Sequence, residues 1–148
     1  SFCSLISVTE EIKNFYKFGK YWIKKKDVRP INFKQNIFKD ICMFTNTPYK
    51  WGGKSYKGID CSALVQLFFK FNNLRCPRDA KDQIRYFKKP KKIKKGAIIF
   101  WKGHVAICLS KNILIHAYGP KKKVLIMNIK RTIKLIERTA KLQVIGIR

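Results

Sequence analysis

Two kinds of hydrophobic spacing divide this chain into a helical first part and a strand-rich second part. Apolar residues recur every three or four positions over residues 33–44 and again over 64–71, which predicts two amphipathic helices. Asn32 is a candidate N-cap of the first helix, and Asn72-Asn73 marks the end of the second. Asp79, with Asp82 three residues later, indicates the start of another helix.

After Gly96 the pattern changes to short apolar runs that predict β-strands. These runs cover residues 97–101, 104–109, 113–118, 124–129 and 142–147, with a short helix over about 132–138 between the last two. Helices followed by a mostly antiparallel sheet indicate an α+β domain, which we expect over residues 32–148.

Residues 1–31 have a different character from the rest of the chain. The stretch from Phe15 to Ile23 is aromatic and strand-prone, with a turn at Gly19, and Arg29-Pro30 follows it. This strand-rich segment is too short to close a barrel by itself. Two interpretations stay open: it is the end of a separate small domain, or it is a strap packed on the main domain.

A loop punctuated by glycines delivers one cysteine to the first turn of the second predicted helix. The loop carries Gly52, Gly53 and Gly58, and Asp60 and Cys61 follow directly. A helix N-terminus offers unpaired N–H groups and the positive end of the helix dipole, and both stabilise a thiolate. Cys61 is therefore the candidate nucleophile.

The chain has two histidines, His104 and His116, on consecutive predicted strands. A three-residue turn that pairs Cys108 with Asn112 would place the two histidines directly opposite each other on one face of a hairpin. A slip of one residue would move one of them to the other face. His104 can then serve as a base for a cysteine nucleophile, with His116 orienting it.

These residues belong to an ordered set of short motifs. The set comprises Thr47-Pro48-Tyr49-Lys50-Trp51-Gly52-Gly53, Gly58-Ile59-Asp60-Cys61-Ser62, Cys76-Pro77-Arg78-Asp79 with Gln83, Phe100-Trp101-Lys102-Gly103-His104-Val105 and Ile115-His116-Ala117. In this order and spacing, residues from about 35 to 148 resemble the NlpC/P60 superfamily of cell-wall cysteine peptidases. The resemblance implies a papain-like fold with N-terminal helices packed on a mostly antiparallel sheet. It also suggests that residues 1–31 are the end of a bacterial SH3-like domain.

Position by position, the resemblance makes Cys61 the nucleophile, His104 the general base and His116 the orienting residue of a Cys-His-His triad. Tyr49 falls where the family places a tyrosine beside the oxyanion site. Asp60, at the helix start, and its neighbour Ser62 fall where some relatives contact the free amine of a substrate peptide.

Two positions depart from the family pattern. Ala97 stands where relatives usually have aspartate, and Ala63 stands where they usually have glycine. Neither change removes a catalytic group, but both bear on substrate fit and local stability.

The activity implied by the resemblance is hydrolysis of amide bonds in peptidoglycan stem peptides, at γ-D-glutamyl–diamino acid bonds, without a cofactor. Three alternatives stay open. The same three residues could serve an amidase or acyltransferase, the chain could be a non-catalytic basic module that binds a polymer, or Cys61, His104 and His116 could bind zinc.

Charge and length change this picture only slightly. The 148 residues suit one compact domain with a fragment of another, and 34 basic against 8 acidic side chains leave a net charge of +26. Such a surface attracts polyanions. Because the lysines fall mostly in turns and at strand ends, a solvated surface is the simpler interpretation, and no specific nucleic acid partner is predicted. Peptidoglycan-derived peptides are the expected partners.

No membrane-spanning run and no signal peptide are predicted from the chain. By resemblance the protein is bacterial, and both the cytoplasm, where wall peptides are recycled, and the cell envelope remain open. The oligomeric state is open as well.

The five cysteines show neither a paired framework nor a metal-binding spacing. Their odd number favours a reducing compartment and an unpaired Cys61. Cys42 and Cys108 lie within apolar patterns, where a free cysteine commonly packs as a small hydrophobic residue.

Overall fold

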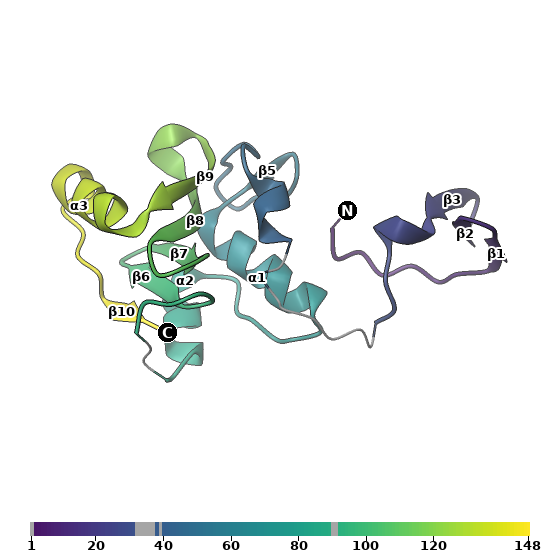
Figure 1. Cartoon of the computed structure of the whole chain (residues 1–148), viewed down its shortest axis with the longest axis horizontal. Helices are drawn as coiled ribbons and strands as arrows, with labels where there is room; N and C mark the ends of the chain where they lie inside the picture. Colours follow the sequence, from purple (N-terminus) through teal and green to yellow (C-terminus); the bar gives the residue numbers. More distant parts are fainter. Residues whose placement is uncertain (1, 32–37, 39, 90–91) are drawn as a thin grey trace.

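The described residues form a small N-terminal sheet and a larger lobe with three α-helices, a five-stranded sheet and a two-stranded hairpin (Figure 1). The computed structural model describes residues 2–31, 38, 40–89 and 92–148. Figure 1 shows the N-terminal sheet at one end of the molecule, well separated from the large sheet at the other end.

The N-terminal sheet is a three-stranded antiparallel meander. It consists of β1 (Glu10–Ile12), β2 (Phe15–Phe18) and β3 (Tyr21–Lys24), followed by the 3-10 helix η1 (Lys25–Asp27). The predicted turn is present at Gly19, whose φ of +54° lies in the left-handed region that glycine adopts without strain.

Phe2, which precedes the N-terminal sheet in the chain, packs against the rings of Phe44, Phe68 and Phe71 in the larger lobe, with centroid distances of 5.4, 5.1 and 4.5 Å.

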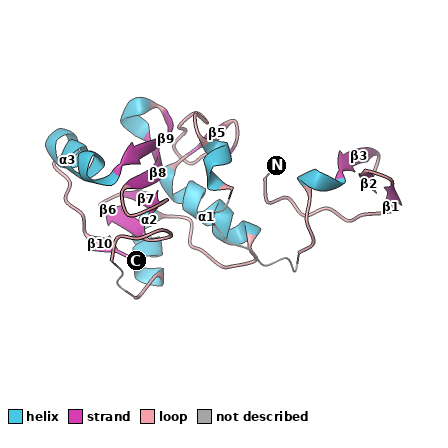
Figure 2. Cartoon of the chain, viewed as in Figure 1, coloured by secondary structure: helices cyan, strands magenta, loops and turns pink. Residues whose placement is uncertain are grey.

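The large sheet has five antiparallel strands in the order β10-β6-β7-β8-β9 (Figure 2). Its strands are β6 (Ile98–Trp101), β7 (His104–Cys108), β8 (Ile113–Tyr118), β9 (Lys123–Asn128) and β10 (Gly146–Ile147), with the 3-10 helix η3 (Gly119–Lys121) between β8 and β9. The first four match the predicted strands closely. The last predicted strand is reduced to two residues, and the short predicted helix is the longer α3 (Ile129–Ala140).

Both faces of the large sheet are buried. On one face Val105, Ile107 and Ile115 belong to the same core as helix α1 (Cys61–Phe71). On the other face Ala106, Cys108 and Leu114 join a second core that includes residues of α3. This alternation along β7 is the reason that helices lie on both sides of the sheet. The α+β prediction is confirmed.

The helical part before the sheet is only partly as predicted. Helix α1 ends at Phe71, as its apolar face indicates, and α2 (Ala80–Tyr86) begins after Asp79. However, Asp79 makes no side-chain capping hydrogen bond. Most of the first predicted helix, residues 32–37 and 39, lies outside the described residues, and its end is the 3-10 helix η2 (Ile41–Phe44).

Two further predictions are wrong in detail. Strand β7 pairs with β8 through Ile107–Ile115 and Cys108–Leu114, so the register differs by two residues from the predicted one and the turn lies over residues 110–112. A shift of two preserves the face on which each side chain lies. Cys108 is buried as expected, but Cys42 is exposed.

A short hairpin precedes α1. Strands β4 (Lys54–Ser55) and β5 (Gly58–Ile59) pair with each other, and Ile59, the last residue of β5, is fully buried. Within the described part of the chain, no helix is both long enough and apolar enough to cross a membrane.

Candidate active site

Cys61 is the first residue of α1, and the residue before it holds the helix end in place. The Asp60 carboxylate accepts a hydrogen bond from the backbone N–H of Ala63 at 2.8 Å, which caps the helix. A second bond, from the N–H of Gly52 at 2.9 Å, ties the preceding loop to the same carboxylate. The loop and helix α1, which carries Cys61, are therefore anchored to one side chain.

The loop needs its glycines for space. A Cβ atom on Gly53 would lie 2.5 Å from the carbonyl oxygen of Gly58, so a larger residue would push the two strands of the hairpin apart. Gly52 has φ +74°, a conformation that side chains disfavour.

The Cys61 thiol lies against strand β7. Burial raises the pKa of this thiol to about 11, and backbone hydrogen bonds from Val105, Ser62 and Cys61 itself act in the opposite direction. The helix N-terminus thus favours the thiolate as predicted, but burial outweighs it. The contact with Val105 brings the sulfur to the residue that follows His104.

The two histidines meet directly. His104 Nε2 lies 2.9 Å from His116 Nδ1, a hydrogen-bond distance, although the strands do not have the predicted register. His116 is fully buried, and its ring stacks on Tyr118 with a centroid distance of 4.8 Å and an interplanar angle of 11°. The Trp101 ring also lies near His104, with a centroid distance of 5.5 Å.

Burial holds both imidazoles neutral. It lowers the pKa of His104 to about 4, and together with the neighbouring His104 charge it lowers the pKa of His116 to about 3. With the raised pKa of Cys61, these shifts favour a neutral thiol beside a neutral imidazole in the free protein. Among the described residues no hydrogen bond joins the Cys61 thiol to His104, a separation that substrate-free sites often show.

Cys61 lines a cleft of about 440 Å³, a volume within the range that binds small molecules and peptides. The residues along it are Trp51, Gly52, Asp60, Cys61, Ser62, Arg78, Asp79, Ala80, Lys81 and Gly103. Gly103 directly precedes His104, so the cleft runs from the start of α1 to the start of β7. Two of the three candidate substrate-binding residues, Asp60 and Ser62, lie along it.

Arg78 is a site residue whose role the sequence left open. Its guanidinium donates to both oxygens of Asp60, at 2.9 and 2.5 Å, and to the hydroxyl of Ser62 at 2.9 Å. Gln83, which is fully buried on α2, donates to the Ser62 carbonyl at 2.9 Å. Planar, bidentate pairing with a carboxylate is what arginine does best, so a Cys-Pro-Arg motif downstream of an Asp-Cys motif is the signal that could have found it.

Tyr49 lies beside the same region. Its backbone N–H donates to the Lys122 carbonyl at 2.8 Å, and its ring packs against Gly119. Burial raises the pKa of its hydroxyl, and the nearby Cys61 and Asp60 charges raise it further. The structure therefore brings Tyr49 within electrostatic reach of Cys61.

The described residues contain no set of side chains arranged to bind zinc. In the part of the chain that the structure describes, no three histidine, cysteine or acidic side chains converge as a metal ion would require. The five cysteines are all unpaired.

Comparison with known proteins agrees with this geometry. The chain is 28% identical over 151 residues to a protein of Bacillus subtilis named gamma-D-glutamyl-L-lysine dipeptidyl-peptidase, covering 90% of this chain and 51% of that protein. It is 35% identical over 88 residues to dipeptidyl-peptidase 6 of Lysinibacillus sphaericus, covering 57% of this chain and 32% of that protein. The chain thus spans about half of these curated relatives, or less.

The fold has a close counterpart among solved structures. The crystal structure of an NlpC/P60 family protein from Bacillus cereus superposes with a TM-score of 0.81 at 26% identity, covering 97% of this chain and 52% of that one. That coverage includes the N-terminal sheet as well as the larger lobe.

A profile of the NlpC/P60 family matches residues 46–139, which contain the loop, α1, the cleft and both histidine-bearing strands. With the shared fold and the ordered motifs, this match shows that the chain belongs to the NlpC/P60 family.

Proposed function

We propose that this protein is a cysteine peptidase that hydrolyses amide bonds in bacterial peptidoglycan stem peptides. The observation that carries the proposal is the His104–His116 hydrogen bond, together with a cleft that Cys61 lines and that reaches Gly103, the residue before His104. The named peptidases among its relatives support a hydrolase of this kind. Because the chain spans only part of those proteins, its activity and substrate stand as proposals.

In the proposed reaction His104 removes the proton from the Cys61 thiol. The raised pKa of the Cys61 thiol and the lowered pKa of His104 favour a neutral pair over a preformed thiolate, so the mechanism includes this general-base step. The thiolate then attacks the amide carbonyl carbon, and the developing oxyanion accepts hydrogen bonds from the Cys61 backbone N–H and the Tyr49 hydroxyl. Protonated His104 gives its proton to the leaving amine, and water hydrolyses the resulting thioester.

We further propose the γ-D-glutamyl–diamino acid bond as the bond cleaved. Support comes from the Bacillus subtilis relative, whose name specifies a γ-D-glutamyl-L-lysine linkage and which aligns with 90% of this chain. Asp60 and Ser62, which line the cleft, would contact the free amine of the peptide. Because Arg78 already balances the charge of Asp60, we expect this carboxylate to attract an ammonium group less strongly than a free one would.

Digestion of stem peptides of defined sequence, free and attached to the wall sugar, read by mass spectrometry, tests both levels of the proposal. Wild-type protein should release the dipeptide that ends in D-glutamate, and Cys61→Ala should release no product. Cys42→Ala is the matched control, because this thiol is exposed and lies outside the residues that line the cleft. Full activity in Cys61→Ala would refute the mechanism, whereas cleavage at an amide bond to the sugar would favour the amidase alternative.

A further inference from the structure

Strand β9 brings a methionine to the buried end of the histidine pair. The sulfur of Met127 lies 3.3 Å from His116 Nε2, the ring nitrogen that points away from His104. In the β8–β9 register His116 is paired with Leu125, so Met127 is its diagonal neighbour on the same face. For the described residues, the Met127 sulfur is the single hydrogen-bonding neighbour of this nitrogen.

The two imidazoles, each neutral, can share their protons in two ways. In the first arrangement His104 Nε2–H donates to His116 Nδ1, and His116 carries its own proton on Nε2, facing Met127. In the second arrangement His116 Nδ1–H donates to His104 Nε2, so that His104 must carry its proton on Nδ1. The observed 2.9 Å distance fits both arrangements, because either nitrogen can be the donor.

Only the first arrangement leaves a working base. Since His104 Nε2 is occupied by His116, Nδ1 is the one ring nitrogen left to receive a proton from Cys61. In the second arrangement that nitrogen already carries hydrogen and cannot accept another. The difference between the arrangements is therefore the difference between an active and an inactive imidazole.

Met127 distinguishes the two arrangements. A thioether sulfur has lone pairs and no hydrogen, so it can accept a hydrogen bond but never donate one. The sulfur therefore stabilises hydrogen on His116 Nε2, as in the first arrangement. In the second arrangement the lone pairs of the sulfur and of the unprotonated Nε2 face each other, which is unfavourable. His116 is fully buried, so water cannot supply the missing partner in the second arrangement.

We propose that Met127 is a positioning residue that selects the proton arrangement of the His104–His116 pair and so keeps His104 able to act as a base. The inference rests on the proposed function for its catalytic meaning. The part of the proposal that says which nitrogen of His116 carries hydrogen does not depend on whether Cys61 is the nucleophile.

The test combines a spectroscopic reading of the tautomer with kinetics. In ¹⁵N-histidine-labelled protein, nitrogen chemical shifts and two-bond N–H couplings should show hydrogen on Nε2 of both rings. Met127→Leu keeps the size and removes the acceptor, so the Nδ1–H form of His104 should become detectable. The value of kcat should fall by about threefold to tenfold, the factor expected for one modest hydrogen bond, with KM unchanged.

Two further variants separate this role from packing. Met43→Leu, at the other methionine of the chain, is the matched control: Met43 is 64% exposed and its replacement should change neither reading. Met127→Gln supplies a carbonyl acceptor of similar reach and should restore the Nε2–H signal and most of kcat. Unchanged tautomers and kcat in Met127→Leu would overturn the proposal.

The tautomer can also be read in Cys61→Ala, which has no nucleophile. In Cys61→Ala both rings should carry hydrogen on Nε2. Adding Met127→Leu to this variant should again make the Nδ1–H form of His104 detectable. These two results would support the proposal even if the proposed peptidase activity were absent. Hydrogen on His104 Nδ1 in that protein would refute it independently of any activity measurement.

Discussion

His104 and His116 differ from ordinary surface histidines because they bond to each other, and because His116 is fully buried and His104 partly buried. Neutral rings serve two ends: in the proposed mechanism His104 accepts a proton from Cys61, and the neutral form is the one that burial favours. The pKa shifts to about 4 and about 3 follow from burial, and they connect catalysis and stability through the same two side chains.

Activity should therefore persist in mild acid. His104 is a base only when it is unprotonated, so in the free enzyme kcat/KM should stay level as the pH falls through 6.5 and decline as it approaches about 4. A pH profile measured on a defined stem peptide tests this. An acid limb centred near 6.5 would show that the imidazole of the free enzyme is solvated.

The free energy of unfolding should respond to pH over the same interval. Both folded pKa values lie below the ordinary 6.5, so the unfolded chain binds more protons, and stability that is complete above pH 6.5 is lost as the pH falls toward 4. The loss is at most about 1.4 kcal/mol per pH unit for each histidine. Urea unfolding of Cys61→Ala at several pH values measures it without interference from activity.

At the scale of elements, the site depends on how α1, the glycine loop and the start of α2 are joined. Asp60 accepts hydrogen bonds from Gly52 in the loop, from Ala63 in α1 and from Arg78 before α2. Gln83 adds a further bond from α2 to the Ser62 carbonyl. One acidic side chain thus sets the position of the thiol relative to strand β7.

Replacing Arg78 should loosen this junction. Arg78→Met leaves the almost buried Asp60 carboxylate without its cation, and we expect a loss of about 1–3 kcal/mol in unfolding free energy, since the arginine itself is partly exposed. Arg85→Met is the matched control, because its 4.0 Å contact with Asp82 is exposed and should contribute less than about 0.5 kcal/mol.

Chemical denaturation measures both variants, and stem-peptide hydrolysis should fall in Arg78→Met alone. Equal stability of the two variants would mean that the Asp60–Arg78 pair does not hold the junction together.

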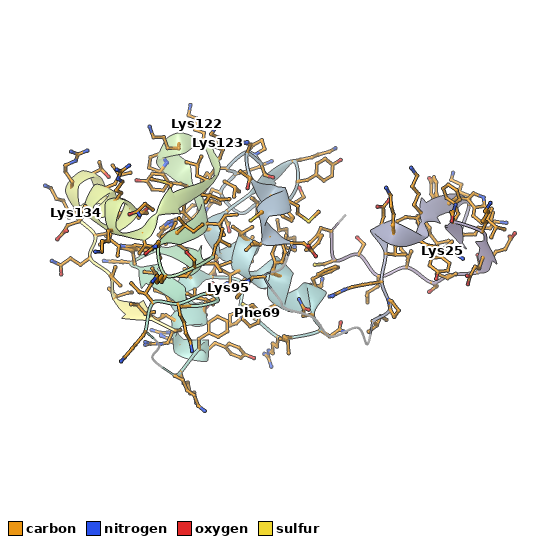
Figure 3. The ribbon with its side chains drawn as sticks, in the orientation of Figure 1. Lys25, Phe69, Lys95, Lys122, Lys123 and Lys134 are labelled. Carbon is orange, nitrogen blue, oxygen red and sulfur yellow. The ribbon has the colours of Figure 1, made fainter. Side chains whose placement is uncertain are left out.

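At the scale of the whole molecule, two features matter: the distribution of charge and the packing of Phe2 on the large lobe. From residue 83 to the end, the chain has eighteen basic side chains and a single acidic one, Glu137. Figure 3 shows Lys122, Lys123 and Lys134 at the outer edge of the large lobe, far from the N-terminal sheet. By contrast, the cleft is lined by two acidic side chains, Asp60 and Asp79, and two basic ones, Arg78 and Lys81. The excess positive charge thus lies largely outside the cleft.

The contacts of Phe2 should contribute measurably to the free energy of unfolding. Phe2 packs against three aromatic rings of the large lobe, so Phe2→Ala should lower the unfolding free energy by about 2 kcal/mol, below the full cost for a completely buried ring. Leu5→Ala, at a side chain that is 76% exposed, is the control and should have little effect. Thermal unfolding compares the two variants, and equal midpoint temperatures would show that Phe2 does not stabilise the large lobe.

Much of this architecture was predictable because it depends on local patterns. The apolar spacing of α1, the alternation along β7 and the Asp60 cap are each readable within a few residues. The three candidate catalytic residues were identified from the same local signals and from family resemblance. Cys42 shows the limit of such reasoning: its neighbours are apolar, but the 3-10 geometry of η2 turns it toward solvent.

The sequence by itself determined which residue types are present and which face of each strand they occupy, because side-chain direction alternates with every residue along a strand. It could not determine the pairing of β7 with β8, since registers two residues apart bury the same face and differ only in which turn closes. The contacts of Arg78 with Asp60 and of Met127 with His116 were likewise decided by the tertiary structure. They join residues 18 and 11 positions apart in the chain, and no local pattern specifies the distance between such atoms.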